Sequence, residues 1–334
     1  MAESTLSLNR TDYLGAIGRA NGKSRNLTEW NDAEFLEDAE TALDVGIRQF
    51  CQPPVLPGEQ HAHQWSFMQP LFSMTTRAPY GTGTVTVVSG VATLAGGTFP
   101  SWAASGEVVV EGISYSVNTR DSSTQVTLDD TSLNVAAGAT YVLQQWDYDL
   151  PDLFGGFQGH LNYGTTGSAI WGKINRVEVQ EILDERKSPS VAVLRPQIYA
   201  VQVKDQTGAA GTRMQLMLYP GPDAAYGVNG TYTINPWSLT TSLPYPMGGM
   251  PHAETLRESI LAAAEVEFTG TRGVHYATFI ERLRTSVSFD RCQNGPIILG
   301  HNGDGTNMGE SWDRRPDGRY ACFDPVTIGT LLHQ

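Results

Sequence analysis

The strongest amphipathic helix patterns of this chain stand in two pairs, one at each end of a long strand-like stretch. Apolar residues recur at spacings of three and four over residues 9–21 and 32–51, and again over residues 252–268 and 278–289. Helices of this modest length cannot each bury an apolar face alone. The sequence therefore predicts that the first pair packs against the second, so that the two ends of the chain form one helical core.

The ends and buried faces of these helices can be predicted residue by residue. Asn9 or Thr11 is expected to cap the first helix, and Asn31 with Glu34 forms a capping-box pattern before the second. The pair Pro53-Pro54 ends the second helix. The apolar positions predicted to face the core are Tyr13, Leu14, Ile17 and Ala20, then Phe35, Leu36, Ala39, Leu43, Ile47 and Phe50, then Leu256, Ile260, Ala263 and Ala264, and finally Phe279, Ile280, Leu283 and Val287.

Between the helix pairs the sequence is typical of strands and turns. Residues 80–146 consist of short Val- and Thr-rich runs separated by Gly and Ser turns, which predicts a small inserted β-barrel or sandwich of about five or six strands. Residues 173–236 predict a second sheet with one short helix. The Gly-rich residues 152–172 predict an irregular segment anchored by its aromatic side chains, Phe154, Phe157, Tyr163 and Trp171.

The fold class predicted from this order is α+β. The expected parts are an N-terminal part of the helical core (1–79), the inserted β domain (80–146), a second β-rich region (147–246), the C-terminal helices that complete the core (247–290) and an extended tail (291–334).

Residues 213–236 place two alternating strands around a rigid Pro-Gly-Pro corner, a pattern that predicts a hairpin. The apolar positions of its inner face are Met214, Leu216 and Leu218 in the first strand and Tyr226, Val228, Tyr232 and Ile234 in the second. No nucleophile, acid or metal ligand stands where chemistry could use it, so we expect this segment to contribute packing only.

Composition narrows the classes of partner. With 22 Lys and Arg against 35 Asp and Glu, the net charge is -13, and binding to nucleic-acid phosphates needs clustered basic residues. Specific DNA binding is therefore not expected. The apolar runs are far shorter than the roughly 20 residues of a membrane span, the N-terminus lacks an apolar signal core, and a soluble protein is expected. Three dispersed cysteines, Cys51, Cys292 and Cys322, favour reduced thiols.

Two segments carry weak metal-site patterns. His61 and His63 could face one side of a strand, but no third ligand of matching type is near in sequence, so a loop with solvated histidines beside packed Trp65 and Phe67 is favoured. Residues 301–313 supply oxygen ligands without EF-hand spacing or flanking helices, which favours a turn-rich surface loop. We expect no metal and no cofactor.

Signals for catalysis are also weak. The Gly-rich residues 155–159 and 164–172 lack a phosphate-binding or nucleophile-elbow setting, which makes Ser168 a poor nucleophile candidate. Pairs of carboxylates suggest a glycosidase with an aromatic sugar platform, yet such pairs are common in an acidic chain. The residues concerned are Asp129 with Asp130, Asp147 with Asp149, and Trp146 with Tyr148 as the platform. The favoured interpretation is that the chain is not an enzyme.

Several segments resemble head-to-tail adaptor (connector, or neck) proteins of tailed bacteriophages. The resemblance begins at Tyr219, Pro220, Pro222, Tyr226, Tyr232 and Pro236. It continues in IRQFCQPP at the end of the second predicted helix, in TVTVVSGVATLAGGTFPSWAA and in IILGHNGD, so that it spans most of the chain. It implies a virion structural protein, assembled in the host cytoplasm, whose ring of about twelve copies lies below the portal and joins the DNA-filled capsid to the tail.

The partners that the resemblance implies are further copies of the chain, the portal protein and tail or nozzle proteins, with DNA passing through the channel unbound. A ring of such acidic subunits would present a negative lumen to which DNA does not adhere. The predicted docking element is the tail, whose apolar residues we expect to order on the portal or a neighbouring subunit. These residues are Trp312, Tyr320, Phe323, Ile328, Leu331 and Leu332.

Other interpretations remain open from the sequence. The apolar tail residues could instead cover the helices of their own subunit. The β insertion and its aromatic residues would also suit a carbohydrate-binding or fibre-docking tail component, and a glycan hydrolase is a weaker alternative.

Overall fold

A computed structural model of the chain describes residues 3–164, 172–187, 193–207 and 211–294. Residues Met1–Asp290 form one unit, which holds nearly all of the helices and strands. Of the second unit, Arg291–Gln334, the structure describes only the last turn of one helix. The predicted α+β class is confirmed.

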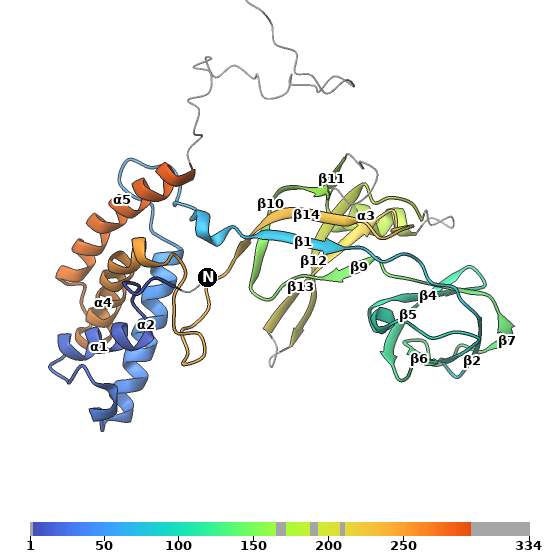
Figure 1. The fold of residues 1–334 in the computed structure, drawn as a ribbon, viewed down its shortest axis with the longest axis horizontal. Helices are drawn as coiled ribbons and strands as arrows, with labels where there is room; N and C mark the ends of the chain where they lie inside the picture. Colours follow the sequence, from blue (N-terminus) through green and yellow to red (C-terminus); the bar gives the residue numbers. More distant parts are fainter. Residues whose placement is uncertain (1–2, 165–171, 188–192, 208–210, 295–334) are drawn as a thin grey trace, which may run out of the picture. The chain divides into compact units, whose positions relative to one another are not determined.

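Four helices form the helical core, and the predicted joining of the two ends is confirmed. They are α1 (Arg10–Ala20), α2 (Ala33–Cys51), α4 (Ala253–Thr269) and α5 (Val274–Asn294). Their apolar faces meet in one cluster that includes Leu14, Leu43, Ile260 and Leu283, and Figure 1 shows the blue N-terminal helices beside the brown and orange C-terminal ones. Because each helix is short, this shared core supplies the burial that none could supply alone.

Most of the predicted helix details hold, with two exceptions. Asn9, one of the two expected capping residues, caps α1, and it forms a capping box with Asp12. The cap of α2 is Asp32 rather than Asn31, because the Asp32 carboxylate accepts a hydrogen bond from the Phe35 N–H. Ala20 is exposed, since it lies in the last turn of α1 beyond the core.

A curled sheet of seven strands forms the second β-rich region. In spatial order the strands are β1 (Leu71–Thr75), β14 (Gly227–Ile234), β10 (Phe154–Tyr163), β11 (Lys173–Arg176), β12 (Ile198–Thr207), β13 (Gly211–Tyr219) and β9 (Asp147–Asp149). All neighbours are antiparallel except β11 and β12. A parallel pair needs a crossover, and α3 (Val179–Arg186) lies in it, with Ile182 packed on Ala200 and Met217.

The predicted hairpin at residues 213–236 is wrong. Both strands exist and their inner faces join one core as expected, but β13 pairs with β12 and β9, whereas β14 pairs with β1 and β10. The Pro-Gly-Pro corner does not close a tight turn, because the Gly221 carbonyl accepts a hydrogen bond from the Leu194 N–H and Gly221 packs on the Trp146 indole. The chain is thereby led from one part of the curled sheet to another.

The prediction of an irregular segment at residues 152–172 is also wrong, because residues 154–163 form the strand β10. The strand is irregular at its glycines, which interrupts the alternating pattern expected of a strand. Gly156 and Gly159 have positive φ, and the pairing with β14 shifts register twice. The predicted anchors Phe154, Phe157 and Tyr163 are buried, whereas Trp171 lies outside the described residues.

A second curled sheet forms the insertion, with seven strands rather than the five or six expected. In chain order these are β2 (Thr84–Val88), β3 (Val91–Ala95), β4 (Glu107–Val110), β5 (Ile113–Arg120), β6 (Gln125–Leu128), β7 (Val135–Ala139) and β8 (Tyr141–Gln144). Alternate residues such as Val85, Val87 and Leu94 fill its own core. Among the described residues, no helix combines the length and apolarity that crossing a bilayer requires.

Candidate interaction surfaces

Helices α2 and α4 cross in close contact at Gly46. A Cβ atom added to Gly46 would lie 2.4 Å from the Cα atom of Ile260, so no larger residue fits without moving backbone. The Ser259 hydroxyl donates to the Gly46 carbonyl oxygen at 2.8 Å and is fully buried. Packing and hydrogen bonding together fix the crossing, which positions the surface beside it.

A groove of about 370 Å³ opens beside this crossing, and we call it the α2/α4 groove. Its lining residues are Val45, Gln49, Gln52, Pro54, Ala262, Ala263, Val266, Glu267, Arg272 and Tyr276. The floor is made of small buried alanines, while Val45 and Val266 are exposed on its walls. The Arg272 guanidinium stacks 4.6 Å from the centre of the Tyr276 ring. Exposed apolar walls with a polar rim are typical of a contact surface.

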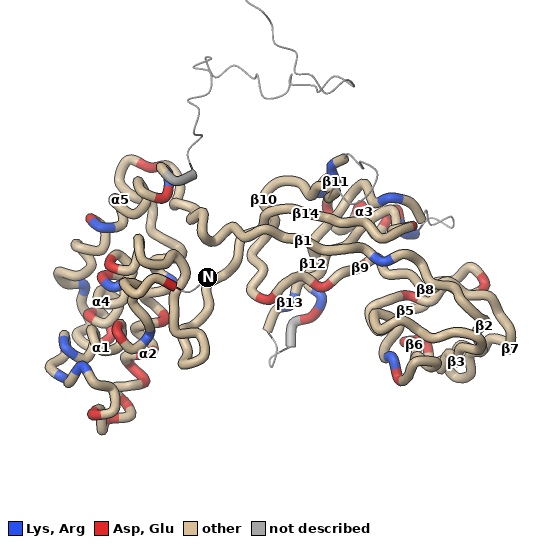
Figure 2. The backbone as a smooth tube through the Cα atoms, in the orientation of Figure 1, with Lys and Arg blue, Asp and Glu red and all other residues tan. Residues whose placement is uncertain are grey.

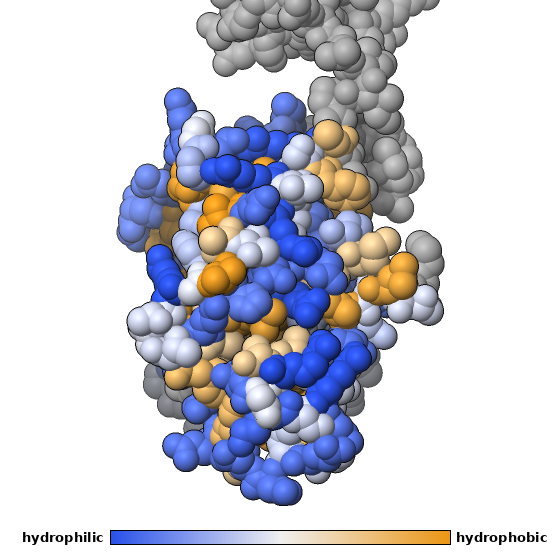
Figure 3. All heavy atoms as spheres, turned by 90° about the vertical axis from the view of Figure 1, so that its left-hand side faces the viewer, coloured by the Kyte–Doolittle hydropathy of each residue, from blue (hydrophilic) through white to orange (hydrophobic). Residues whose placement is uncertain are grey.

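A second group of exposed apolar side chains lies on the N-terminal segment and on the loop before α4. The Arg10 N–H donates to the Pro244 carbonyl at 2.8 Å, and the carboxylate of Glu3 lies beside Gly249, so the two segments are neighbours. The large exposed apolar side chains of these segments are Leu6, Leu243, Tyr245 and Met250, which we call the N-terminal apolar patch. Figure 3 looks onto the end of the molecule that holds the helices, where apolar side chains lie in separate groups among hydrophilic ones.

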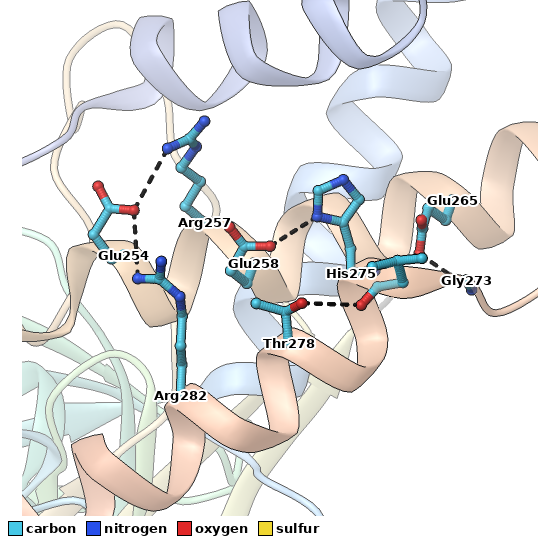
Figure 4. A network of polar contacts seen from close by, with 9 residues as sticks. Glu254, Arg257, Glu258, Glu265, Gly273, His275, Thr278 and Arg282 are labelled. Atoms are coloured by element: carbon cyan, nitrogen blue, oxygen red, sulfur yellow. Dashed lines mark hydrogen bonds and ion pairs between the residues drawn. The ribbon is translucent and has the colours of Figure 1, made fainter.

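Polar contacts join α4 to α5, as Figure 4 shows. The Glu254 carboxylate forms two ion pairs, with Arg257 of its own helix at 3.5 Å and with Arg282 of α5 at 3.6 Å. These pairs are partly exposed, so each contributes little to stability. The buried Glu258 lies 2.7 Å from the His275 Nδ1 atom, which gives a buried carboxylate a partner at the start of α5.

The start of α5 is capped by a side chain of the preceding helix. One oxygen of Glu265 accepts hydrogen bonds from the N–H groups of Gly273 and His275, at 3.1 and 3.2 Å. A carboxylate at this position satisfies N–H groups that the helix leaves free and complements the helix dipole. The tight α4–α5 turn therefore holds Arg272 and Tyr276 at the rim of the α2/α4 groove.

A buried carboxylate, Asp290 on α5, ties the loop after α2 to the end of the helical core. His63 Nε2 lies 2.8 Å from one Asp290 oxygen, which also accepts from the Ser66 N–H at 3.2 Å, while the Ser66 hydroxyl donates to the other oxygen. Burial alone would raise the pKa of Asp290, but the hydrogen bonds from Ser66 and His63 outweigh it and hold the pKa below its usual range. The Asp290 carboxylate is therefore ionised at neutral pH.

The expectation of two solvated histidines is wrong for His63 and right for His61, which is exposed. The expected packing of Trp65 and Phe67 is confirmed, and the Trp65 indole N–H donates to the Phe50 carbonyl at 2.8 Å. Among the described residues, no group of three His, Cys, Asp or Glu side chains could hold a metal ion.

His252 lies buried at the start of α4 in a box of aromatic rings. The rings of Phe50, Trp65, Phe67 and Phe289 lie between 5.1 and 6.1 Å from its own, and its Nδ1 atom has no hydrogen-bond partner in the part of the chain that the structure describes. Burial lowers the pKa of His252, and the nearby Asp290 opposes that shift while His63 adds to it. The imidazole is therefore held neutral in the folded protein.

This environment predicts a stability change in mild acid. Because the folded pKa of His252 is below the unfolded value of about 6.5, the unfolded chain takes up the proton first as the pH falls. The free energy of unfolding should therefore decrease from about pH 7 to about pH 5, and His252→Phe should reduce that decrease. Urea unfolding of both proteins at several pH values measures this decrease in the free energy of unfolding. The exposed control His61→Phe should leave the slope unchanged, and a His252→Phe slope equal to that of the wild type would contradict the assignment.

One of the two suggested carboxylate pairs and the suggested aromatic platform are engaged in structural contacts, whereas Asp129 and Asp130 are exposed. Asp147 pairs with Arg186 at 2.7 Å, and Asp149 pairs with Lys204 at 2.7 Å. Trp146 and Tyr148 are both buried, so the proposed sugar platform is wrong: the Arg186 guanidinium lies over the Trp146 ring, and the Tyr148 hydroxyl donates to the Gln145 carbonyl. These residues hold β9 and α3 on the sheet.

The distribution of charge is uneven, as Figure 2 shows. The insertion carries few charges, with one Arg against five Asp and Glu in residues 80–146. The helical core is richer in charge, and Glu34 and Glu37 on the exposed side of α2 form no ion pair with any residue that the structure describes. The insertion is thus poor in charged residues, yet its net charge of one minus five, or -4, is a large share of the -13 of the whole chain.

The predicted docking residues and two disfavoured candidate sites lie outside the described residues. These are the tail residues Trp312, Tyr320, Phe323, Ile328, Leu331 and Leu332, the calcium-like loop at 301–313, and Ser168. Cys51 is buried and Cys292 is exposed, both as free thiols, while Cys322 is not described.

No protein-family model matches this sequence, and no curated protein matches it. The sequence alone does not reveal these surfaces, because the groove and the Asp290 contacts join residues far apart in the chain. The one available signal was Gly46, a glycine in the middle of an otherwise strong helix pattern.

Proposed function

We propose that this protein is a structural component of a tailed-phage neck that assembles into a ring below the portal and continues the DNA channel toward the tail. The proposal draws on the sequence resemblance and on the folded architecture. A helical core built from both ends of the chain, with β domains carried between them, suits a subunit that packs laterally through its helices.

The observation that carries the proposal is the presence of the α2/α4 groove on the helical core and of a separate group of exposed apolar side chains on the segments that precede α1 and α4. A closed ring needs each subunit to offer two unlike, complementary surfaces, whereas a twofold dimer needs only one. The α2/α4 groove and the N-terminal apolar patch meet this requirement in kind.

The charge of the chain is compatible with DNA passage. A net charge of -13 disfavours adhesion of DNA phosphates, so DNA would slide past such subunits. The tail, residues 291–334, remains the proposed docking element for the portal. The hydrolase alternative loses support because Trp146 and Tyr148 are buried and Asp147 and Asp149 are paired with basic side chains.

Assembly of the full-length chain tests the proposal. We expect ring-shaped particles in negative-stain images and a mass of many subunits by sedimentation, either from the protein alone or after addition of portal rings. A chain that stays monomeric and does not bind portal rings would contradict the proposed function. Binding to glycan arrays without any ring would favour the carbohydrate-binding alternative instead.

A further inference from the structure

We propose that the free edge of β1 takes up one further strand, formed by residues 297–299 of the chain's own C-terminal tail. This attachment goes beyond the proposed neck function and does not require a ring. It would give the start of the tail a defined place on the sheet that β1 begins.

The direction of the backbone groups of β1 follows from its pairing with β14. β1 lies at one edge of the seven-stranded sheet and pairs with β14 alone among the described strands. The Tyr232 N–H donates to the Pro70 carbonyl at one end of this pairing, and the Thr76 N–H donates to the Tyr226 carbonyl at the other. Even-numbered residues of β1 thus bond to β14, and in an antiparallel pair the alternate residues point their N–H and C=O groups to the other side.

The free edge of β1 consists of the odd-numbered residues Leu71, Ser73 and Thr75. All three are exposed, and their N–H groups have no backbone partner among the residues that the structure describes. The next odd-numbered residue, Arg77, does have a partner, because its N–H donates to the Tyr148 hydroxyl at 3.0 Å. The three residues before it therefore offer donors and acceptors to one more strand.

β1 lacks the devices that usually protect an edge strand, which are charged side chains, proline and bulges. The strand at the other edge of the sheet, β9, carries Asp147 and Asp149. In contrast, the five residues of β1 read LFSMT, without charge or proline, and their pairing with β14 has no register shift. A regular and uncharged edge of this kind is one that an added strand extends.

The chain leaves the described residues near β1. Asp290 on α5 accepts hydrogen bonds from the N–H and the hydroxyl of Ser66, and β1 begins five residues later at Leu71. Leu71 therefore lies at most about 18 Å along the chain from Ser66. The last turn of α5, which ends at Asn294, and three extended residues after it carry position 297 about 17 Å from Asp290. The start of β1 is thus within reach of the segment.

The sequence of the segment suits this edge. Residues 295–300 read Gly-Pro-Ile-Ile-Leu-Gly, an uncharged run with strand-forming residues between a proline and a glycine. Consecutive apolar residues are typical of a strand that is covered on both faces. β1 offers apolar contacts on both, because Met74 packs partly exposed against the core of the sheet and Leu71, on the opposite face, is 72% exposed.

Hydrogen exchange of the full-length chain, resolved to single residues by mass spectrometry with electron-transfer fragmentation, tests the attachment. We expect the Ser73 amide to exchange at least about tenfold more slowly than an unpaired amide. Ile298→Pro removes an N–H group and disfavours a strand, so it should return Ser73 to the unpaired rate. Phe72 and Met74, whose amides bond to β14, should stay protected and report that the sheet is folded. Thr306→Pro, a control further along the tail, should leave all three amides unchanged.

Ser73→Pro tests the same contact from the side of β1. Because the Ser73 N–H points away from β14, its loss leaves the pairing with β14 in place. Ser73→Thr keeps the N–H and is the matched control. We expect the amides of residues 297–299 to be protected in the wild type and in Ser73→Thr, and to exchange at the unpaired rate in Ser73→Pro.

Three results would overturn the proposal. The first is a Ser73 amide that exchanges at the unpaired rate in the wild type. The second is protection of Ser73 that survives Ile298→Pro, since another segment or another chain would then cover β1. The third is protection that disappears when the protein is diluted until sedimentation shows monomers, because the strand would then come from a second copy. Protection that persists in the monomer supports attachment within one chain.

Discussion

Replacing Gly46 by alanine is expected to lower the free energy of unfolding by about 3 kcal/mol, the upper part of the range for overpacked cores. The new Cβ atom would lie 2.4 Å from the Cα atom and 2.8 Å from the backbone nitrogen of Ile260. Backbone atoms cannot rotate away as a side chain can, so α2 and α4 must separate, which also disturbs the Ser259 hydrogen bond to the Gly46 carbonyl. Chemical denaturation of the purified protein measures the loss.

The direction of this change in the free energy of unfolding distinguishes overpacking at the helix crossing from helix propensity. Helix propensity alone predicts that alanine in place of glycine stabilises a helix interior by about 1 kcal/mol. The exposed control Thr41→Ala on the same helix should change stability by less than about 0.5 kcal/mol. Truncating Ile260 to alanine should not rescue Gly46→Ala, because the nearest atom is the Ile260 Cα. A stabilised Gly46→Ala variant would show that the helices are free to move apart.

The helical core could be predicted because its signal is local. Apolar residues such as Phe35, Leu43 and Ile47 repeat within one helix, and the shortness of the helices requires a shared core. The cap of α2 was misplaced by one residue since Asn31 and Asp32 are both good capping residues and only the geometry distinguishes them.

The pairing of strands could not be predicted, because it depends on contacts remote in sequence. The inner faces of β13 and β14 follow from alternation, yet nothing local shows that Gly221 bonds to Leu194 and thereby separates the two strands. The strand β10 was missed because its bulges at Gly156 and Gly159 break the period of two that identifies a strand.

The interaction surfaces could not be predicted for the same reason. The α2/α4 groove combines residues of α2, α4 and α5, and the N-terminal apolar patch combines two segments more than two hundred residues apart. Their side chains are ordinary valines, leucines and methionines whose exposure only the fold decides. The sequence instead favours the tail as the docking element, because aromatic residues stand in a Gly-rich segment there.

Asp290→Ala is expected to lower the free energy of unfolding by about 3 kcal/mol. The substitution removes the acceptor for His63 Nε2, for the Ser66 hydroxyl and for the Ser66 N–H, at a site where Asp290 is only 4% exposed. These donors bind water in the unfolded chain, and in the folded variant they would lack any acceptor. That difference lowers the free energy of unfolding. The loop from His63 to Met68, which positions Trp65 against Phe50, would lose its attachment to α5.

The dependence on pH separates this ionised acceptor from a mere packing effect. Because the folded pKa of Asp290 is lowered, its contribution is complete above the unfolded value of about 3.9 and is lost as the pH falls through the folded value. The difference between wild type and Asp290→Asn should therefore shrink in strong acid, below the range where His252 titrates. Asp129→Ala, an exposed control, should cost less than about 0.5 kcal/mol at any pH. In a double-mutant cycle with His63→Ala, additive losses would show that the two side chains do not interact, and the attachment would then have to lie in Ser66 alone.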